Sequence, residues 1–254
     1  MTSTTLPLFY IQPRPLQAAL HDKLSLAEQA GYGFAGATNA VPLVAGEIAV
    51  ACRHYPIVFT EGALPSPVAV LGLRGQENLF VDADGQWRAG HYVPAYIRRY
   101  PFIFMENTDR GEYTLCIDEA AASVVEGRDH PLFNDDGSPS ALSRSALDFC
   151  RDYQNQHAHT MEFMRALAEA DVLVENRADI TLPDGQRLSL SGFKIIDEAK
   201  FNKLPEDEFL RWRANGWLPL VYFHFVSIGT WSTLLDRIQP SAAGTEPGKA
   251  ADSQ

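Results

Sequence analysis

The chain lacks a basic excess. Its 254 residues include 21 lysines and arginines against 32 aspartates and glutamates, which gives a formal net charge of −11. Proteins that bind nucleic acid, or that are held by charge on anionic lipid, usually carry the opposite balance. We therefore expect no nucleic-acid partner. Apolar residues are not scarce, since 46% of the chain is hydrophobic and 11% is aromatic, and this composition excludes a disordered chain.

Cysteine is rare, and Cys52, Cys116 and Cys150 are widely spaced. Three such residues form neither a disulfide framework nor the close pairs of a structural zinc site. Each lies among apolar residues, so we expect small buried side chains in a reducing compartment. The first ten residues have neither the basic start nor the apolar core of a signal peptide. These features together predict a cytoplasmic location.

Long uncharged runs are also missing, apart from the segment between Trp217 and Leu235. Its length approaches the roughly 20 apolar residues that a membrane helix needs. However, Pro219, His224 and Gly229 lie inside it, together with several serines and threonines, and such groups weaken membrane insertion. The segment therefore favours a buried core helix, and we expect no membrane span.

Familiar catalytic motifs are absent too. The glycines at Gly72 and Gly75 have the wrong spacing for a phosphate loop or a dinucleotide fingerprint, and no serine lies in a Gly-x-Ser-x-Gly elbow. Asp135 has an acidic neighbour but lacks the closing glutamate of a calcium loop. In a helix, His157 and His159 would lie about 200° apart, with His157 towards the core. We expect no metal and no cofactor.

Turn signals between short apolar runs are what the chain does contain. Asp84-Gly85, Asn107–Gly111 and Pro183–Gln186 each separate two such runs, which is typical of β-hairpins. Strands are expected over residues 55–60, 67–73, 78–81, 86–88, 101–105, 113–118, 172–174, 180–182, 187–190 and 193–197.

Helical periodicity is clearest from Ser140 to about Ala170, where apolar residues recur at three- and four-residue steps. Because helices and strands do not alternate, we expect an α+β fold. In it, antiparallel hairpins form a mainly antiparallel sheet that packs against this long amphipathic helix and C-terminal helices. Residues 1–238 are expected to form a single domain and 239–254 a disordered tail. Further helices are expected over residues 44–53, 92–100, 204–216 and 217–235, and residues 31–36 as a strand or loop.

Aromatic, basic and amide side chains are densest between Gly72 and Phe104. The adjacent Arg98 and Arg99 can hold a carboxylate, a phosphate or another polar ligand against aromatic walls. They can equally pair with acids and stack on rings as part of the fold. His224 is expected in the core, where burial lowers a histidine pKa. The candidate ligand-binding residues are Arg74, Glu77, Asn78, Trp87, His91, Tyr92, Tyr96, Arg98, Arg99 and His224.

Several segments of this block carry a resemblance to a known family. They include Glu77-Asn-Leu-Phe-Val-Asp, Tyr92-Val-Pro-Ala-Tyr-Ile-Arg-Arg-Tyr-Pro-Phe and, later, Leu220-Val-Tyr-Phe-His-Phe-Val-Ser, and Glu47 precedes them. With these motifs the chain resembles the bacterial SapC family up to about Arg237. The resemblance carries over no catalytic residues. It implies a link to surface-layer loci and a halogenase-like protein as a partner, encoded nearby.

Three functions agree with these observations. The first is a cytosolic accessory or binding protein that recognises a small polar or anionic ligand, or a partner enzyme, through the aromatic and arginine side chains. The second is an enzyme that uses His91 or His224 as acid or base and Arg98 or Arg99 as an anion clamp. The third is a surface-layer or cell-envelope component, which rests on the resemblance alone. The sequence leaves the oligomeric state open.

Overall fold

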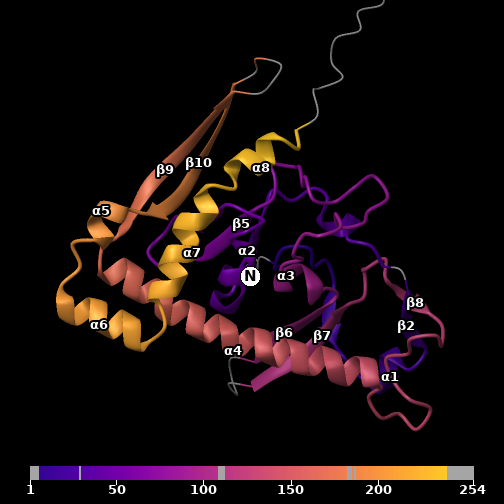
Figure 1. Cartoon of the computed structure of the whole chain (residues 1–254). Coiled ribbons are helices and arrows are strands. Elements are labelled where there is room, and N and C mark those ends of the chain that lie inside the picture. Colours follow the sequence, from indigo (N-terminus) through magenta and orange to yellow (C-terminus); the bar gives the residue numbers. More distant parts are fainter. Residues whose placement is uncertain (1–5, 29, 108–111, 182–184, 186, 239–254) are drawn as a thin grey trace, which may run out of the picture.

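A computed structural model describes residues 6–28, 30–107, 112–181, 185 and 187–238 of the chain. The fold is α+β, and each strand pairing in it is antiparallel, as the turn signals predicted (Figure 1). Within the described residues the strands are β1 (Pro13–Pro15), β2 (Leu24–Leu26), β3 (Ala40–Pro42), β4 (Ile57–Thr60), β5 (Pro67–Val70), β6 (Phe102–Asn107), β7 (Glu112–Asp118), β8 (Val124–Glu126), β9 (Leu173–Thr181) and β10 (Arg187–Ile196).

The helices differ widely in length, and one of them is much longer than the rest (Figure 1). They are α1 (Ala18–His21), α2 (Ile48–Ala51), α3 (Ala95–Arg98), α4 (Ala141–Glu169), α5 (Glu198–Phe201), α6 (Glu206–Ala214), α7 (Leu218–Ile228) and α8 (Trp231–Leu235), with short 3₁₀ turns η1 (Gly33–Ala35) and η2 (Ala45–Glu47).

The strands form sheets of three, five and two strands in the described part of the chain. The five-stranded sheet has the order β3-β5-β4-β10-β9, and the β9–β10 hairpin projects from it (Figure 1). The ladder of this hairpin shifts register between Leu190 and Phe193, where Gly192 adopts a φ of +84°. Such a bulge bends a strand and increases its twist.

Helix α4 contributes side chains to three hydrophobic clusters, and Tyr153 belongs to the one that also holds Val44, Ala95 and Tyr96. Cys150 contacts the cluster around β6 and β7, whereas Phe163 and Leu167 contact the larger cluster around the five-stranded sheet. The predicted inward face is largely confirmed, but the prediction for His157 is wrong, because this residue is exposed. It borders an open pocket rather than another element. The three cysteines are buried and free, as expected.

The C-terminal apolar segment forms two helices rather than the one helix predicted. Helix α7 ends at Ile228, and α8 begins only at Trp231. The segment is also less buried than expected, because the outward side of α7 exposes Tyr222 and Val226. No helix in the described ranges has the length and apolar character needed to cross a bilayer.

Other local predictions need correction. The strands predicted at 78–81 and 86–88 are not formed, and a single β-bridge joins Val81 to Trp87 instead. The predicted turn between them is present, with Gly85 at a φ of +74°. The side chain of Asn78 accepts a hydrogen bond from the Phe80 amide, which replaces a strand ladder here. Residues 31–36 contain the turn η1. The helix expected over 92–100 is only the four residues of α3, because Pro94 is its N-terminal cap. Residues 108–111, most of the 183–186 turn and the 239–254 tail lie outside the described residues.

Candidate functional site

The end of the short helix α3 and the two residues after it direct consecutive side chains to different sides of the molecule. Successive helical residues are about 100° apart. Arg98 is consequently exposed, whereas Arg99 is partly buried and lines a pocket against α4. Tyr100 lines another cavity. The two adjacent arginines of the sequence therefore do not act at one place.

Arg99 lies among aromatic rings. Its Cζ atom is 4.2 Å from the ring centroid of Tyr96, 4.5 Å from that of Tyr153 and 5.8 Å from that of Tyr10. Its Nε atom is buried and has no hydrogen-bond partner among the described residues. Buried charges are normally paired with an opposite charge. Within the described residues, however, Arg99 has no carboxylate within 4.0 Å.

The surrounding tyrosines do not neutralise this charge. Burial raises the pKa of Tyr10, Tyr96 and Tyr153 above the usual value for tyrosine. The phenols therefore stay protonated near neutral pH, and the electron-rich faces of their rings stabilise the guanidinium without cancelling its charge. The positive charge of Arg99 remains available to a ligand.

A cavity of about 260 Å³ lies next to Arg99, between α3, α4 and the neighbouring ends of β3 and β5. Two of its polar groups are already engaged. Thr160 accepts a hydrogen bond from the Ala45 amide at 2.8 Å and donates one to the Gln156 carbonyl at 2.6 Å, and Gln154 donates to the Tyr113 hydroxyl at 2.9 Å. The remaining lining is Pro42, Leu43, Ser66, Pro67, Tyr96, Tyr153, His157 and Met161.

His157 adds a titratable group to this cavity. Although His157 is exposed by its accessible area, the neighbouring atoms of the cavity partly desolvate its imidazole and lower its pKa, and the positive charge of Arg99 lowers it further. The ring is therefore neutral at pH 7, where it can both donate and accept a hydrogen bond. An anion bound to Arg99 would offset the charge that lowers this pKa.

Arg98 takes part in a different arrangement. Its Nη2 atom donates to the Tyr92 hydroxyl at 3.0 Å, and that hydroxyl donates to Oε1 of Glu47 at 2.8 Å. Glu47 is buried and also accepts from the amides of Ala95 and Val44 at 2.6 and 3.1 Å. Burial raises the pKa of its carboxyl. This chain of hydrogen bonds joins α3 to η2, so Tyr92 and Arg98 have a structural part.

Four further predicted residues hold local structure together. Asn78 is buried, and its amide donates to the Ala35 carbonyl at 3.0 Å. Trp87 donates to the Tyr55 hydroxyl at 3.3 Å. The guanidinium of Arg74 pairs with Glu77 at 2.8 Å. These residues contact neither Arg99 nor the cavity beside it in the described structure.

The two histidines predicted as acid or base lie elsewhere. Nε2 of His91 contacts Nη2 of Arg237 at 2.8 Å, and its ring packs near His54. His224 is buried in the core, as predicted, and its Nε2 accepts from the Ile196 amide at 3.1 Å. Neither histidine lines the cavity at Arg99, which therefore brings together only Arg99 and Tyr96 of the predicted residues.

The remaining members of the site escaped the sequence prediction. Tyr153, His157 and Thr160 follow each other at steps of four and three residues in α4, so they share one helix face. That spacing was visible in the sequence, but nothing in it linked the face to Arg99. Tyr10 contacts Arg99 although the two residues are 89 positions apart in the sequence, and no local signal predicts such a contact.

Comparisons with known proteins identify a family but no individual relative. A family model described as SapC matches residues 16–234. Neither the curated proteins nor the solved structures contain a match to the chain. Among the described residues, no group of three or more His, Cys, Asp or Glu side chains could hold a metal ion.

Proposed function

The chain belongs to the SapC family, and we propose that it is a binding protein that holds a small carboxylate ligand against Arg99. One observation carries the proposal: this partly buried arginine borders a cavity, has an unpaired Nε and lacks a carboxylate partner within the described structure. A planar guanidinium offers its N–H donors in the geometry of a carboxylate. A ligand carboxylate would supply the missing counter-charge.

The cavity lining indicates the rest of the ligand. Leu43, Pro67 and Met161 offer apolar surface beside the charge, whereas His157 offers a neutral hydrogen-bonding group. A volume of about 260 Å³ suits a molecule of a few carbon atoms. This combination supports a short aliphatic monocarboxylate.

The same lining supports binding over catalysis. Among the described lining residues, His157 is the only imidazole, and neither a carboxylate nor a thiol accompanies it. General acid–base or nucleophilic chemistry normally needs a second such group within hydrogen-bond distance.

Titration calorimetry with butyrate tests the proposal. We expect saturable binding to the wild-type chain and at least tenfold weaker binding to Arg99→Gln, because a charge-assisted hydrogen bond contributes about 1.5–3 kcal/mol. Arg165→Gln is the matched control, since Arg165 is an exposed arginine of α4 outside the cavity. It should bind butyrate like the wild type.

A second variant guards against a folding defect in Arg99→Gln. Met161 lines the cavity and is half-exposed, so Met161→Trp should fill the space while Arg99 stays in place. This variant should also lose butyrate binding. Undiminished binding in both Arg99→Gln and Met161→Trp, or no binding to the wild type, would contradict the proposal.

A further inference from the structure

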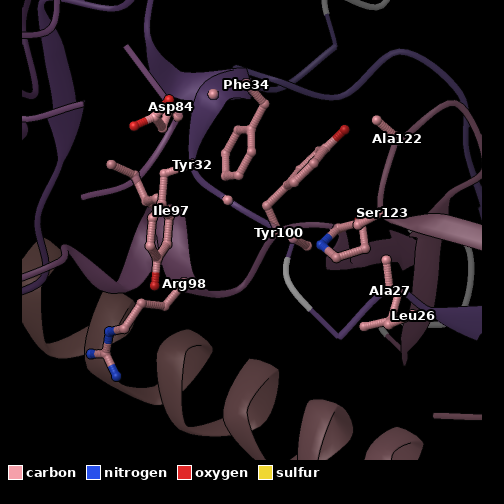
Figure 2. A pocket seen from close by; sticks show the side chains of 15 residues that line it. Leu26, Ala27, Tyr32, Phe34, Asp84, Ile97, Arg98, Tyr100, Ala122 and Ser123 are labelled. Carbon is pink, nitrogen blue, oxygen red and sulfur yellow. The ribbon is translucent and has the colours of Figure 1, made fainter. Parts of the chain in front are cut away.

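A second and larger cavity, of about 660 Å³, lies on another side of α3. Figure 2 shows the aromatic side chains of Tyr32, Phe34 and Tyr100 along it, with Arg98 on one side of the view and Leu26, Ala27 and Ser123 on the other. Of these residues, only Arg98 is among the sequence-predicted candidates. The lining also includes Ala30, Gly31, Gly33, Asp84, Gly85, Ile97, Pro101 and Ala122.

The aromatic wall is held in place by its neighbours. The rings of Phe34 and Tyr100 pack at 4.2 Å between centroids with an interplanar angle of 31°. The Tyr100 hydroxyl donates to the Asp118 carboxylate at 3.2 Å, which fixes the far end of this ring. On the other side, Phe9 meets Phe34 edge to face at 5.1 Å. A wall fixed in this way can accept a flat ring with little loss of side-chain entropy.

Close backbone contact fixes the third ring. The Tyr32 amide donates to the Gly85 carbonyl at 2.6 Å. A Cβ atom on Gly31 would lie 2.7 Å from the same oxygen, so only glycine permits this approach. Tyr32 itself packs edge to face on Trp87 at 5.8 Å between centroids. The segment that carries Tyr32 and Phe34 is therefore pressed against the 84–85 turn.

The polar groups of this cavity differ from those at Arg99. The guanidinium of Arg98 is engaged with the Tyr92 hydroxyl and the Val93 carbonyl, both at 3.0 Å. By contrast, the Ser123 hydroxyl is buried and has no hydrogen-bond partner among the described residues. An unpaired buried hydroxyl is unfavourable. If the Ser123 side chain turns towards the cavity, a ligand with a hydrogen-bonding group at this position would satisfy it.

From these contacts we propose that this cavity binds a flat aromatic alcohol. The ligand's ring lies against Phe34 and Tyr100, and its hydroxyl group meets Ser123. Aromatic and aliphatic walls with a small number of polar side chains, here Asp84, Arg98 and Ser123, are typical of small-molecule sites. This inference does not depend on the carboxylate site, because Tyr32, Phe34, Tyr100 and Ser123 do not line the cavity at Arg99.

Fluorescence anisotropy of 2-naphthol tests the inference on the full chain. We expect saturable binding to the wild type and about three- to tenfold weaker binding to Phe34→Leu, which removes the stacking ring. Ser123→Ala should weaken binding by a similar factor, because it removes one hydrogen bond. Phe104→Leu is the matched control, since Phe104 is half-buried in β6 and outside the cavity.

Ala30→Trp separates binding from folding. Ala30 is exposed at the cavity wall, so the larger ring should enter the cavity without disturbing the core and should abolish 2-naphthol binding. Arg99→Gln should bind 2-naphthol normally, and excess butyrate should not displace it. Equal affinity in the wild type, Phe34→Leu and Ala30→Trp would overturn the inference, as would an absence of saturable binding to the wild type.

Discussion

His224 shows how burial alters a single side chain. Only 1% of the residue is exposed, and burial lowers its pKa from 6.5 to about 4. Its folded-state pKa therefore lies below its unfolded value. The stabilisation that this difference provides is complete above about pH 6.5 and is lost as the pH falls towards 4. A shift of this size corresponds to about 3 kcal/mol.

His224→Gln isolates this contribution, because glutamine offers an acceptor for the Ile196 amide but does not titrate between pH 4 and 7. We expect a variant that is less stable at pH 7 and loses less stability than the wild type on acidification. Urea unfolding at several pH values between 4 and 7 measures both. His159→Gln, at an exposed position of α4, should keep the wild-type slope. An unchanged slope in His224→Gln would refute this assignment.

Among the elements, α4 was predicted nearly to the residue, and the short helices were not. Its signals are local: an apolar face that repeats along the helix and Ser140 at its start. The prediction of a single helix over residues 217–235 was wrong because it was inferred from the absence of charge alone. Gly229 interrupts that segment, and packing against the sheet decides which of its side chains are buried. The spacing of apolar residues in the sequence does not predict which side chains pack against the sheet.

The start of α4 gives a prediction at the scale of one element. The Ser140 hydroxyl accepts a hydrogen bond from the Ser143 amide at 3.2 Å. Ser140→Ala should lower the free energy of unfolding by about 1 kcal/mol, because the cap satisfies an otherwise unpaired amide. Ser145→Ala, at an exposed position within the same helix, should change stability by much less. Chemical denaturation compares the two, and equal effects would argue against the cap.

At the scale of the whole molecule, the sequence predicted the fold class and the local part of the site. Arg99 and Tyr96 belong to one segment, so a dense block of aromatic and basic residues was enough to identify them. Tyr10 and the strand ends at Pro42 and Pro67 join them only through tertiary packing. The larger cavity was not predicted, because its rings come from segments around residues 32–34 and 100 that only the fold brings together.

The net negative charge of the chain makes Arg99 an exception among its surroundings. In a chain with a net charge of −11, Arg99 is a partly buried cation that no described carboxylate neutralises. An acidic surface repels small anions, so a carboxylate must gain its affinity from this one charge and its immediate surroundings. The cytoplasmic location and the partner enzyme stay predictions.

NMR titration of the His157 imidazole with pH, with and without saturating butyrate, tests the carboxylate site most directly. Arg99 lowers the pKa of this imidazole, and a carboxylate bound to Arg99 would offset that charge. We expect butyrate to raise the pKa of His157 in the wild type and to leave it unchanged in Arg99→Gln. A pKa that butyrate does not move in the wild type, or moves equally in Arg99→Gln, would contradict it.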